Sequence, residues 1–573
     1  MTKKFNKILN WFDENILLIL SGFLIAFIPL FPKIPLVDLI PGYIVRMRIE
    51  DIFVFITALV WFIQVLRKKV KWHSIIFSII VAYLVIGLLS ILSAIFVIPS
   101  IPLQLLHIGK TVLHWVRYFE YFMLFAITFS AVKSKKDVQL LIYIVILTTL
   151  AIVVYGYGQR YYYWPVYSTM NREFSKGVRL YLTENARVQS TFAGHYDLAA
   201  YLVIVLNLIL ALALKATRKL KKMLFYGVYL VGLWLLILTA SRASYIAYYC
   251  GTLAVIALIT AEQKTLAKKL KYGLSHFVGF SLLMVIMTLT FGKDIQDRFL
   301  HVMRAYPEIE QNVVAAKEFV ENSTHDVEAF LGLREKRTIP DNWIAVDNVL
   351  TNTDERPTEI APDRTRPDDV YVDVPITTNV ATESADGTTT YTTVSSERTW
   401  SANAMKYGLS TAIRLDTLWP NAINGFKFNP LLGKGYATLN KESFEHFTEA
   451  ESTDNNYLRI LGETGLLGFI TFFAIVVIAI YLAFKFSQAD HSDTAVISIG
   501  YIGASIGLLV NALYIDVFAS SKIAFTYWAI TGAVMALYTF ESNQPLLGKI
   551  KIMTRSRHSK SSVPNQLNIK KKS

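Results

Sequence analysis

The chain has 573 residues, of which 53% are hydrophobic and only 17% are charged, and its mean hydropathy is +0.40. Soluble globular proteins carry charge on about a quarter of their residues, so this composition excludes that class and favours a membrane protein. The net charge is +14, but the basic residues gather mainly in short loops and tails, which indicates membrane topology and argues against nucleic-acid binding.

Apolar runs long enough to cross a hydrocarbon core of about 30 Å recur along the chain. The first run follows a basic start and has no small-residue cleavage site after it, so we predict a retained helix and not a signal peptide. About twelve transmembrane helices are predicted in all, at residues 15–31, 51–66, 74–98, 111–132, 138–158, 196–214, 223–240, 243–261, 273–292, 457–484, 494–515 and 522–540.

Basic clusters mark alternate loops of this arrangement. They lie at residues 67–71, 133–136, 215–222 and 264–271, and the tail at 549–572 is basic as well. Because cytoplasmic loops carry the excess of lysine and arginine, all of these segments are predicted to be cytoplasmic, with both termini inside.

The predicted fold class is therefore an all-α polytopic membrane protein in four parts. Helices one to nine occupy residues 1–292, one large extracytoplasmic loop 293–456, helices ten to twelve 457–540, and a basic cytoplasmic tail 541–573. Residues 293–455 hold 16 basic and 27 acidic residues, a net charge of −11, which leaves +25 for the rest of the chain. The middle of the loop, residues 340–400, is rich in Thr, Asp, Glu and Pro, so we predict a flexible or loosely β-structured insertion there.

A charged residue inside or beside the hydrocarbon core is costly and needs a reason. The apolar stretch 225–259 is interrupted only at 239–242, which predicts a tight turn at the outer membrane face with Arg242 on it. The guanidinium can bind an anionic group, because arginine pairs phosphate bidentately, or it can extend to lipid headgroups. Both interpretations stay open from the residues alone.

A basic stripe opens the fourth predicted span. Its members share one helical face and are His107, Lys110, His114 and Arg117. Glu120 lies one turn beyond Arg117 and is predicted to pair with it. The stripe can bind a polyanionic headgroup, or it can consist of a structural ion pair and interfacial anchors, and the second interpretation is preferred.

Motifs of soluble catalysis are absent from the sequence: it contains no P-loop, no G-x-S-x-G elbow and no H-E-x-x-H. The one cysteine, Cys250, cannot form an intrachain disulfide or a cysteine-based metal site. We therefore expect no cofactor, no metal site and no nucleotide-driven pump.

Four segments can be compared with a known family. They are residues 187–201 (RVQSTFAGHYDLAAY), 238–245 (LTASRASY), 414–436 (RLDTLWPNAINGFKFNPLLGKGY) and 454–468 (DNNYLRILGETGLLG). In this order, and on one side of the predicted membrane, they resemble the motifs of the O-antigen ligase and polysaccharide polymerase superfamily of bacterial envelope enzymes.

The chain departs from that pattern in two places. The ligases carry histidine where this chain has Asp454, and an N-x-N pattern is replaced around His195 and Asp197. The first departure is closer to the polymerase branch.

The resemblance implies a membrane glycosyltransferase of GT-C-like architecture in the bacterial cytoplasmic (inner) membrane, with its active site facing outside the cytoplasm. Such enzymes transfer a glycan from an undecaprenyl-diphosphate-linked donor to a glycan or lipid-linked acceptor, among membrane lipids and without a nucleotide. Polymerase and ligase stay open as alternatives.

The resemblance also implies roles for individual residues. The candidate catalytic residues are Asp454, Arg242 and Arg414: the arginines would stabilise the departing diphosphate and Asp454 would take the proton of the acceptor hydroxyl. Asp454 can instead cap the helix that follows it. The residues expected to bind the substrate are Arg187, His195, Lys110, Arg117 and Asn455. Gly433 and Gly435 permit a tight turn that folds the loop back over the site.

Two other function classes compete with the glycosyltransferase. A multi-pass flippase or transporter of lipid-linked oligosaccharides also suits twelve helices, but its charges should lie near the midplane, whereas these gather at the outer face. A non-catalytic receptor or scaffold would use the large loop as its binding module. The poor apolar content of residues 340–400 argues against this, because a folded binding domain needs a core.

Overall fold

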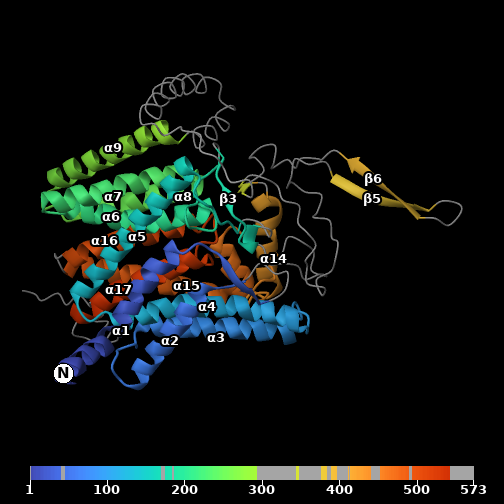
Figure 1. Cartoon of the computed structure of the whole chain (residues 1–573), viewed down its shortest axis with the longest axis horizontal. Helices are drawn as coiled ribbons and strands as arrows, with labels where there is room; N and C mark the ends of the chain where they lie inside the picture. Colours follow the sequence, from blue (N-terminus) through green and yellow to red (C-terminus); the bar gives the residue numbers. More distant parts are fainter. Residues whose placement is uncertain are drawn as a thin grey trace, which may run out of the picture.

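The computed structural model describes residues 2–39, 46–169, 174–183, 186–292, 343–346, 376–383, 389–396, 411, 413–439, 452–489 and 493–541. Within these residues the protein is mostly helical, and its long helices pack side by side (Figure 1). The long helices are α1 (Thr2–Leu30), α2 (Ile49–Leu66), α3 (Ile75–Phe96), α4 (Leu105–Ala131), α5 (Lys135–Tyr162), α6 (His195–Lys215), α7 (Lys219–Leu238), α8 (Arg242–Ala261), α9 (Leu266–Phe291), α15 (Asn456–Ala489), α16 (Asp493–Asn511) and α17 (Ser521–Glu541).

Each predicted span coincides with one of these helices. Ten of them, in the described part of the chain, are long and apolar enough to cross a membrane, and α4 and α17 are the two that are not among the ten. The observed helices support a multi-pass membrane protein, whereas the number twelve and the orientation stay predictions. Helix starts follow the sequence: the hydroxyls of Ser74, Ser134 and Thr265 cap α3, α5 and α9 by accepting a backbone N–H of the first turn.

The central helices are α6 and α16, which are largely buried within the bundle. α16 packs against both α6 and α8, and α17 packs against α4. The contact between α8 and α16 depends on small residues, because a Cβ on Gly251 would lie 2.5 Å from the carbonyl oxygen of Gly503. Such close backbone approach is the usual way in which helices associate within a membrane.

The strands are short and form three two-stranded sheets among the described residues. β1 (Pro35–Asp38) and β2 (Arg46–Arg48) pair antiparallel, and β3 (Leu180–Tyr181) and β4 (Ile344–Ala345) pair parallel. β5 (Ile376–Glu383) and β6 (Thr389–Ser396) form an antiparallel hairpin inside the insertion predicted at 340–400. The rest of that insertion lies outside the described residues, apart from 343–346.

Helix α15 is broken near its start, and the broken turn holds a loop. Gly465 has a φ of +65°, so the helical hydrogen bonds of the following two residues are not made. Leu466 and Leu467 donate their N–H groups to the carbonyls of Pro430 and Leu431 at 2.8 and 3.2 Å. The carbonyls of Gly462 and Glu463, which an unbroken helix would use for those two donors, accept instead from Lys434 and Gly435 at 2.8 and 3.0 Å.

The loop of residues 429–439 can make this exchange because it turns sharply twice. Gly433 and Gly435 have φ values of +70° and +100°, so the predicted tight turn is confirmed. The loop follows a π-helical turn, η2 (Arg414–Leu418), and the short helix α14 (Trp419–Phe428). Every backbone group of the broken turn named above thus finds a partner, which is what the membrane environment requires.

Gly465→Ala should destabilise the protein. A Cβ there would lie 2.4 Å from the backbone of Leu431, and an alanine would have to adopt a left-handed backbone. We expect a loss of about 3 kcal/mol in the free energy of unfolding, seen as a lower midpoint in thermal unfolding of the purified protein. Gly279→Ala in α9 is the matched control, because nothing lies within 4 Å of its Cβ position; it should be neutral or slightly stabilising. Equal midpoints for the two variants would contradict a structural role for the break.

Candidate functional site

Two of the predicted catalytic residues meet at one end of the bundle. Arg414 begins the π-helical turn and Asp454 lies just before α15, and Arg414 Nη2 is 3.0 Å from Asp454 Oδ2. The side chains are 10% and 32% exposed, so the carboxylate is open to a ligand while the guanidinium is nearly enclosed. The guanidinium also lies over the ring of Tyr514, 5.6 Å from its centroid.

Asp454 does not cap α15. Asn455 Oδ1 accepts the N–H of Leu458 at 3.1 Å, which makes Asn455 the residue that caps the helix. Asp454 itself has a φ of +52°, a left-handed conformation that is uncommon outside glycine. Its N–H donates to Ser452 Oγ at 3.1 Å, and its Oδ1 lies 2.8 Å from the same hydroxyl. The alternative that Asp454 is the helix cap is therefore wrong.

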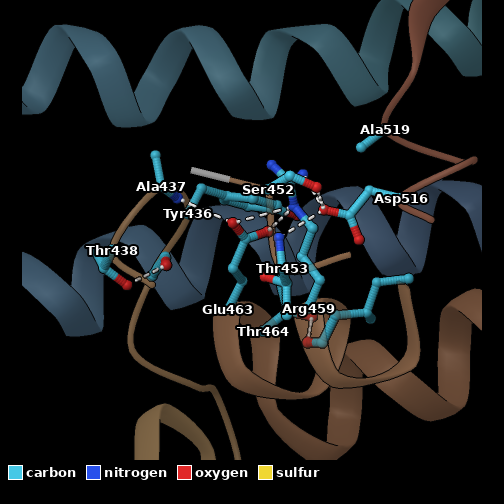
Figure 2. A network of polar contacts seen from close by, with 12 residues as sticks. Tyr436, Ala437, Thr438, Ser452, Thr453, Arg459, Glu463, Thr464, Asp516 and Ala519 are labelled. Carbon is cyan, nitrogen blue, oxygen red and sulfur yellow. Dashed lines mark hydrogen bonds and ion pairs between the residues drawn. The ribbon is translucent and has the colours of Figure 1, made fainter. Parts of the chain in front are cut away.

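A buried carboxylate fixes the segment that carries Asp454. Asp516, in the connection between α16 and α17, accepts the N–H groups of Thr453 and Asn455 at 2.9 and 3.0 Å. Its Oδ2 also lies 2.8 Å from Ser452 Oγ and 2.9 Å from Nη1 of Arg459 (Figure 2). Asp516 thus binds the backbone of both neighbours of Asp454 and fixes the segment that carries it.

The network continues into the loop of residues 429–439. Arg459 pairs with Glu463 one turn along α15, at 3.4 Å. Glu463 Oε1 accepts the N–H of Ala437 at 3.1 Å, so the carboxylate joins the helix to the loop (Figure 2). The side chains of Arg459, Glu463 and Asp516 are 9%, 4% and 7% exposed. Such burial is tolerable only because each charge faces an opposite one.

The sequence interpretation missed Arg459 and Asp516 and treated Glu463 as part of a packing segment. The signal that could have found them was available. Arg459 and Glu463 are an i, i+4 pair at the head of an otherwise apolar helix, and Asp516 lies between two apolar spans. Charges in such places need a partner, which is the same criterion that singled out Arg242.

Residues 187–201, the first of the four segments that resemble the family, lie at the same end of the bundle. Arg187 Nη1 is 2.9 Å from Nε2 of His195, the first residue of α6, so these two predicted residues are brought together. Two residues along, Asp197 lies 3.6 Å from the buried amine of Lys33. Burial lowers the pKa of Lys33, although the charge of Asp197 opposes this shift.

A buried lysine joins this motif to α1 and α17. Lys522, at the start of α17, is fully buried. Its amine donates to the carbonyls of Pro29, Phe31 and Thr191 at 3.0, 2.6 and 2.7 Å. These carbonyls belong to the end of α1 and to the motif preceding α6, so three distant segments converge on one ammonium group.

Two residues of the basic stripe of α4, Lys110 and Arg117, have different surroundings. Arg117 binds both carboxylate oxygens of Asp51 at 2.5 and 3.1 Å, and its pairing with Glu120 at 3.1 Å is confirmed. Arg117 is therefore a structural ion pair. Lys110 is 1% exposed, and its neighbour Thr111 donates to the carbonyl of Tyr436 at 3.2 Å, which links α4 to the loop.

Arg242 is the first residue of α8 and directly follows the short turn that joins it to α7. Its side chain is exposed, and within the described residues it makes no ion pair or side-chain hydrogen bond. In the loop, burial lowers the pKa of Lys434 to about 8, and its amine lies 3.4 Å from the carbonyl of Thr438. Among the residues that the structure describes, no cluster of three or more His, Cys, Asp or Glu side chains could hold a metal ion.

Residues 227–473 match the family model described as O-antigen ligase. This segment includes Arg242, Arg414 and Asp454, whereas Arg187 and His195 precede it. No curated protein matches the chain. The match supports the O-antigen ligase and polysaccharide polymerase superfamily, and with it an enzyme of the ligase or glycosyltransferase kind that transfers glycan and acts among lipid-linked glycans and membrane lipids.

Asp516→Asn should destabilise the protein strongly. An amide cannot balance the charge of Arg459, and it has one acceptor oxygen in place of two. Breaking a buried pair from one side costs about 3–5 kcal/mol, which thermal unfolding of the purified protein would detect. Glu262→Gln is the control, because its pair with Lys215 lies at the surface, with side chains 21% and 34% exposed. That change should cost at most about 1 kcal/mol. Similar losses in the free energy of unfolding of both variants would show that the buried contacts of Asp516 do not stabilise the protein.

Proposed function

We propose, from this superfamily, that the protein transfers a glycan from an undecaprenyl-diphosphate-linked donor onto an acceptor sugar at the outer face of the cytoplasmic membrane. The observation that carries the proposal is the ion pair between Arg414 and Asp454. It joins residues of two different motifs, 40 positions apart in the chain, and its carboxylate is 32% exposed.

Residues other than Asp454 cap the helix and anchor this segment. The helix is capped by Asn455, and the segment is fixed by Asp516. Asp454 nevertheless keeps a strained left-handed backbone. Strain that neighbouring contacts enforce is typical of functional positions, which favours a chemical role for this residue.

The reaction needs one base and a stabilised leaving group. The oxygen of the acceptor hydroxyl attacks the anomeric carbon of the donor, forming the new glycosidic C–O bond. The bond from that carbon to the diphosphate oxygen breaks, and its electron pair leaves with the diphosphate. Asp454 accepts the hydroxyl proton. Arg414 and Arg242 offer guanidinium groups to the negative charge that develops on the leaving group.

Of the five residues predicted to bind substrate, three remain candidates and two have structural roles. Arg187 and His195 remain candidates for the donor, because they contact each other at the end of the bundle that carries Asp454. Lys110 remains a candidate as well. Arg117 and Asn455 have structural partners, an ion pair and a helix cap, so we assign them supporting roles.

The proposed orientation rests on charge. The basic segment 215–222 runs into the first turn of α7, and Arg242 comes after the last turn, so they lie at opposite ends of one helix. If basic loops face the cytoplasm, Arg242 faces outside. An active site outside the cytoplasm also suits this donor. The lipid-linked diphosphate already serves as the leaving group, so the reaction needs no nucleotide.

Asp454→Asn should abolish most activity while the protein still folds. Asparagine cannot accept the proton at neutral pH, so transfer of glycan from a purified lipid-linked donor should fall about a hundredfold or more. Product can be measured by gel or mass spectrometry. The neighbouring change Asn455→Ala is the matched control: it should cost about 1 kcal/mol of stability through the lost cap and spare most of the activity. Near wild-type turnover of Asp454→Asn would remove Asp454 from the mechanism.

Arg242→Ala should abolish transfer, because the guanidinium proposed to bind the diphosphate is removed. Membrane insertion should be unaffected, because the exposed side chain makes no described contact. Arg242→Lys keeps the charge but not the bidentate geometry, so it should restore only a small part of the activity. Transfer assays on matched amounts of membrane-inserted protein would measure both. Normal product from the well-expressed alanine variant would exclude this role, and full activity of the lysine variant would mean that charge alone suffices.

A further inference from the structure

A pocket at the far end of the bundle from Asp454 carries a second inference. It lies between the start of α5, the turn from α6 to α7 and the start of α16, and its volume is about 310 Å³. α6 runs from His195, beside Arg187, to Lys215, which lines this pocket. The pocket and the candidate active site therefore lie at opposite ends of the same helices.

Three basic residues line the pocket. Lys215, Arg218 and Lys221 all line it. Lys215 has an ion pair with Glu262. Arg218 and Lys221 have no ion pair within the described residues, and the amine of Lys221 lies 3.5 Å from the hydroxyl of Tyr143. Two uncompensated cations in one concave site favour an anionic ligand.

Apolar side chains line the pocket as well. Ile142, Phe225 and Val496 contribute to its lining. On the face of α5 that carries the pocket-lining Tyr143, Leu140 and Leu147 are 49% and 69% exposed. Side chains of this kind belong in hydrocarbon, so the apolar outer surface of α5 extends to the residues that line the pocket.

We propose that this pocket binds the headgroup of an anionic phospholipid. The phosphate accepts hydrogen bonds from the Arg218 guanidinium and the Lys221 ammonium, and the acyl chains lie along Leu140 and Leu147 of α5. The exposed apolar surface beside the cations favours a lipid over a soluble phosphate, which would leave that surface without a ligand. The proposal is independent of the proposed glycan transfer.

The test compares lipid retention by the purified full-length protein. Native mass spectrometry would count phosphatidylglycerol molecules bound to the wild type and to the double variant Arg218→Gln/Lys221→Gln. The control is Lys264→Gln/Lys268→Gln, which removes the same charge from exposed positions at the start of α9 that do not line the pocket. All four side chains are exposed, so both variants should fold. If the double variant does not fold, the two single variants carry the test.

The expected result is a loss of phosphatidylglycerol affinity of roughly fivefold for each cation removed from the pocket, with little change in the control and none for phosphatidylcholine. Equal losses in both double variants would indicate diffuse surface attraction and overturn the proposal. Unchanged retention in the pocket variant would also overturn it. Glycerol phosphate, added as a soluble competitor, should not displace the lipid at equal concentration; displacement would assign the site to a free phosphate instead.

Discussion

The exchange of hydrogen bonds at Gly465 is the constraint on which the rest of the site depends. The break in α15 leaves two donors and two acceptors that must be satisfied, and the loop of residues 429–439 satisfies all four. The loop then presents Ala437 to Glu463, and from Glu463 the contacts pass through Arg459 to Asp516. Asp516 holds the residues on either side of Asp454. A backbone irregularity in a helix thus determines where a carboxylate lies at the end of the bundle.

The three charges of this chain of contacts are costly to bury, and the cost has a structural consequence. Arg459 and Glu463 lie one turn apart in α15, whereas Asp516 lies in the connection between α16 and α17. A single one of these charges, without its partners, would be unfavourable in an apolar environment. The arrangement is favourable only when the loop, the start of α15 and the connection after α16 are all in place. The site should therefore form as a unit and not by independent docking of its parts.

The sequence predicts the helices well because hydropathy is a local property. All predicted spans coincide with helices, and the two turn glycines of the loop were recognised from residue type alone. The site was predicted less completely, because its contacts join segments far apart in the chain. Arg117 was expected to pair with Glu120 on its own helix, yet its closer partner is Asp51 of α2, which no helical spacing indicates. Asp454 and Asn455 are both good cap residues, and only the observed hydrogen bond shows which one caps.

Lys522 has a consequence for how the protein is made. Its amine satisfies carbonyls at the end of α1 that a helix leaves without partners, and Phe31 precedes it by 491 residues. At about 5–20 residues per second, the ribosome needs roughly 25–100 seconds to pass from one to the other. During that time the end of the first helix must rely on water, headgroups or the insertion machinery for its hydrogen bonds. α17 therefore completes the hydrogen bonding at the end of α1, and a chain released before residue 522 would lack the group that does so.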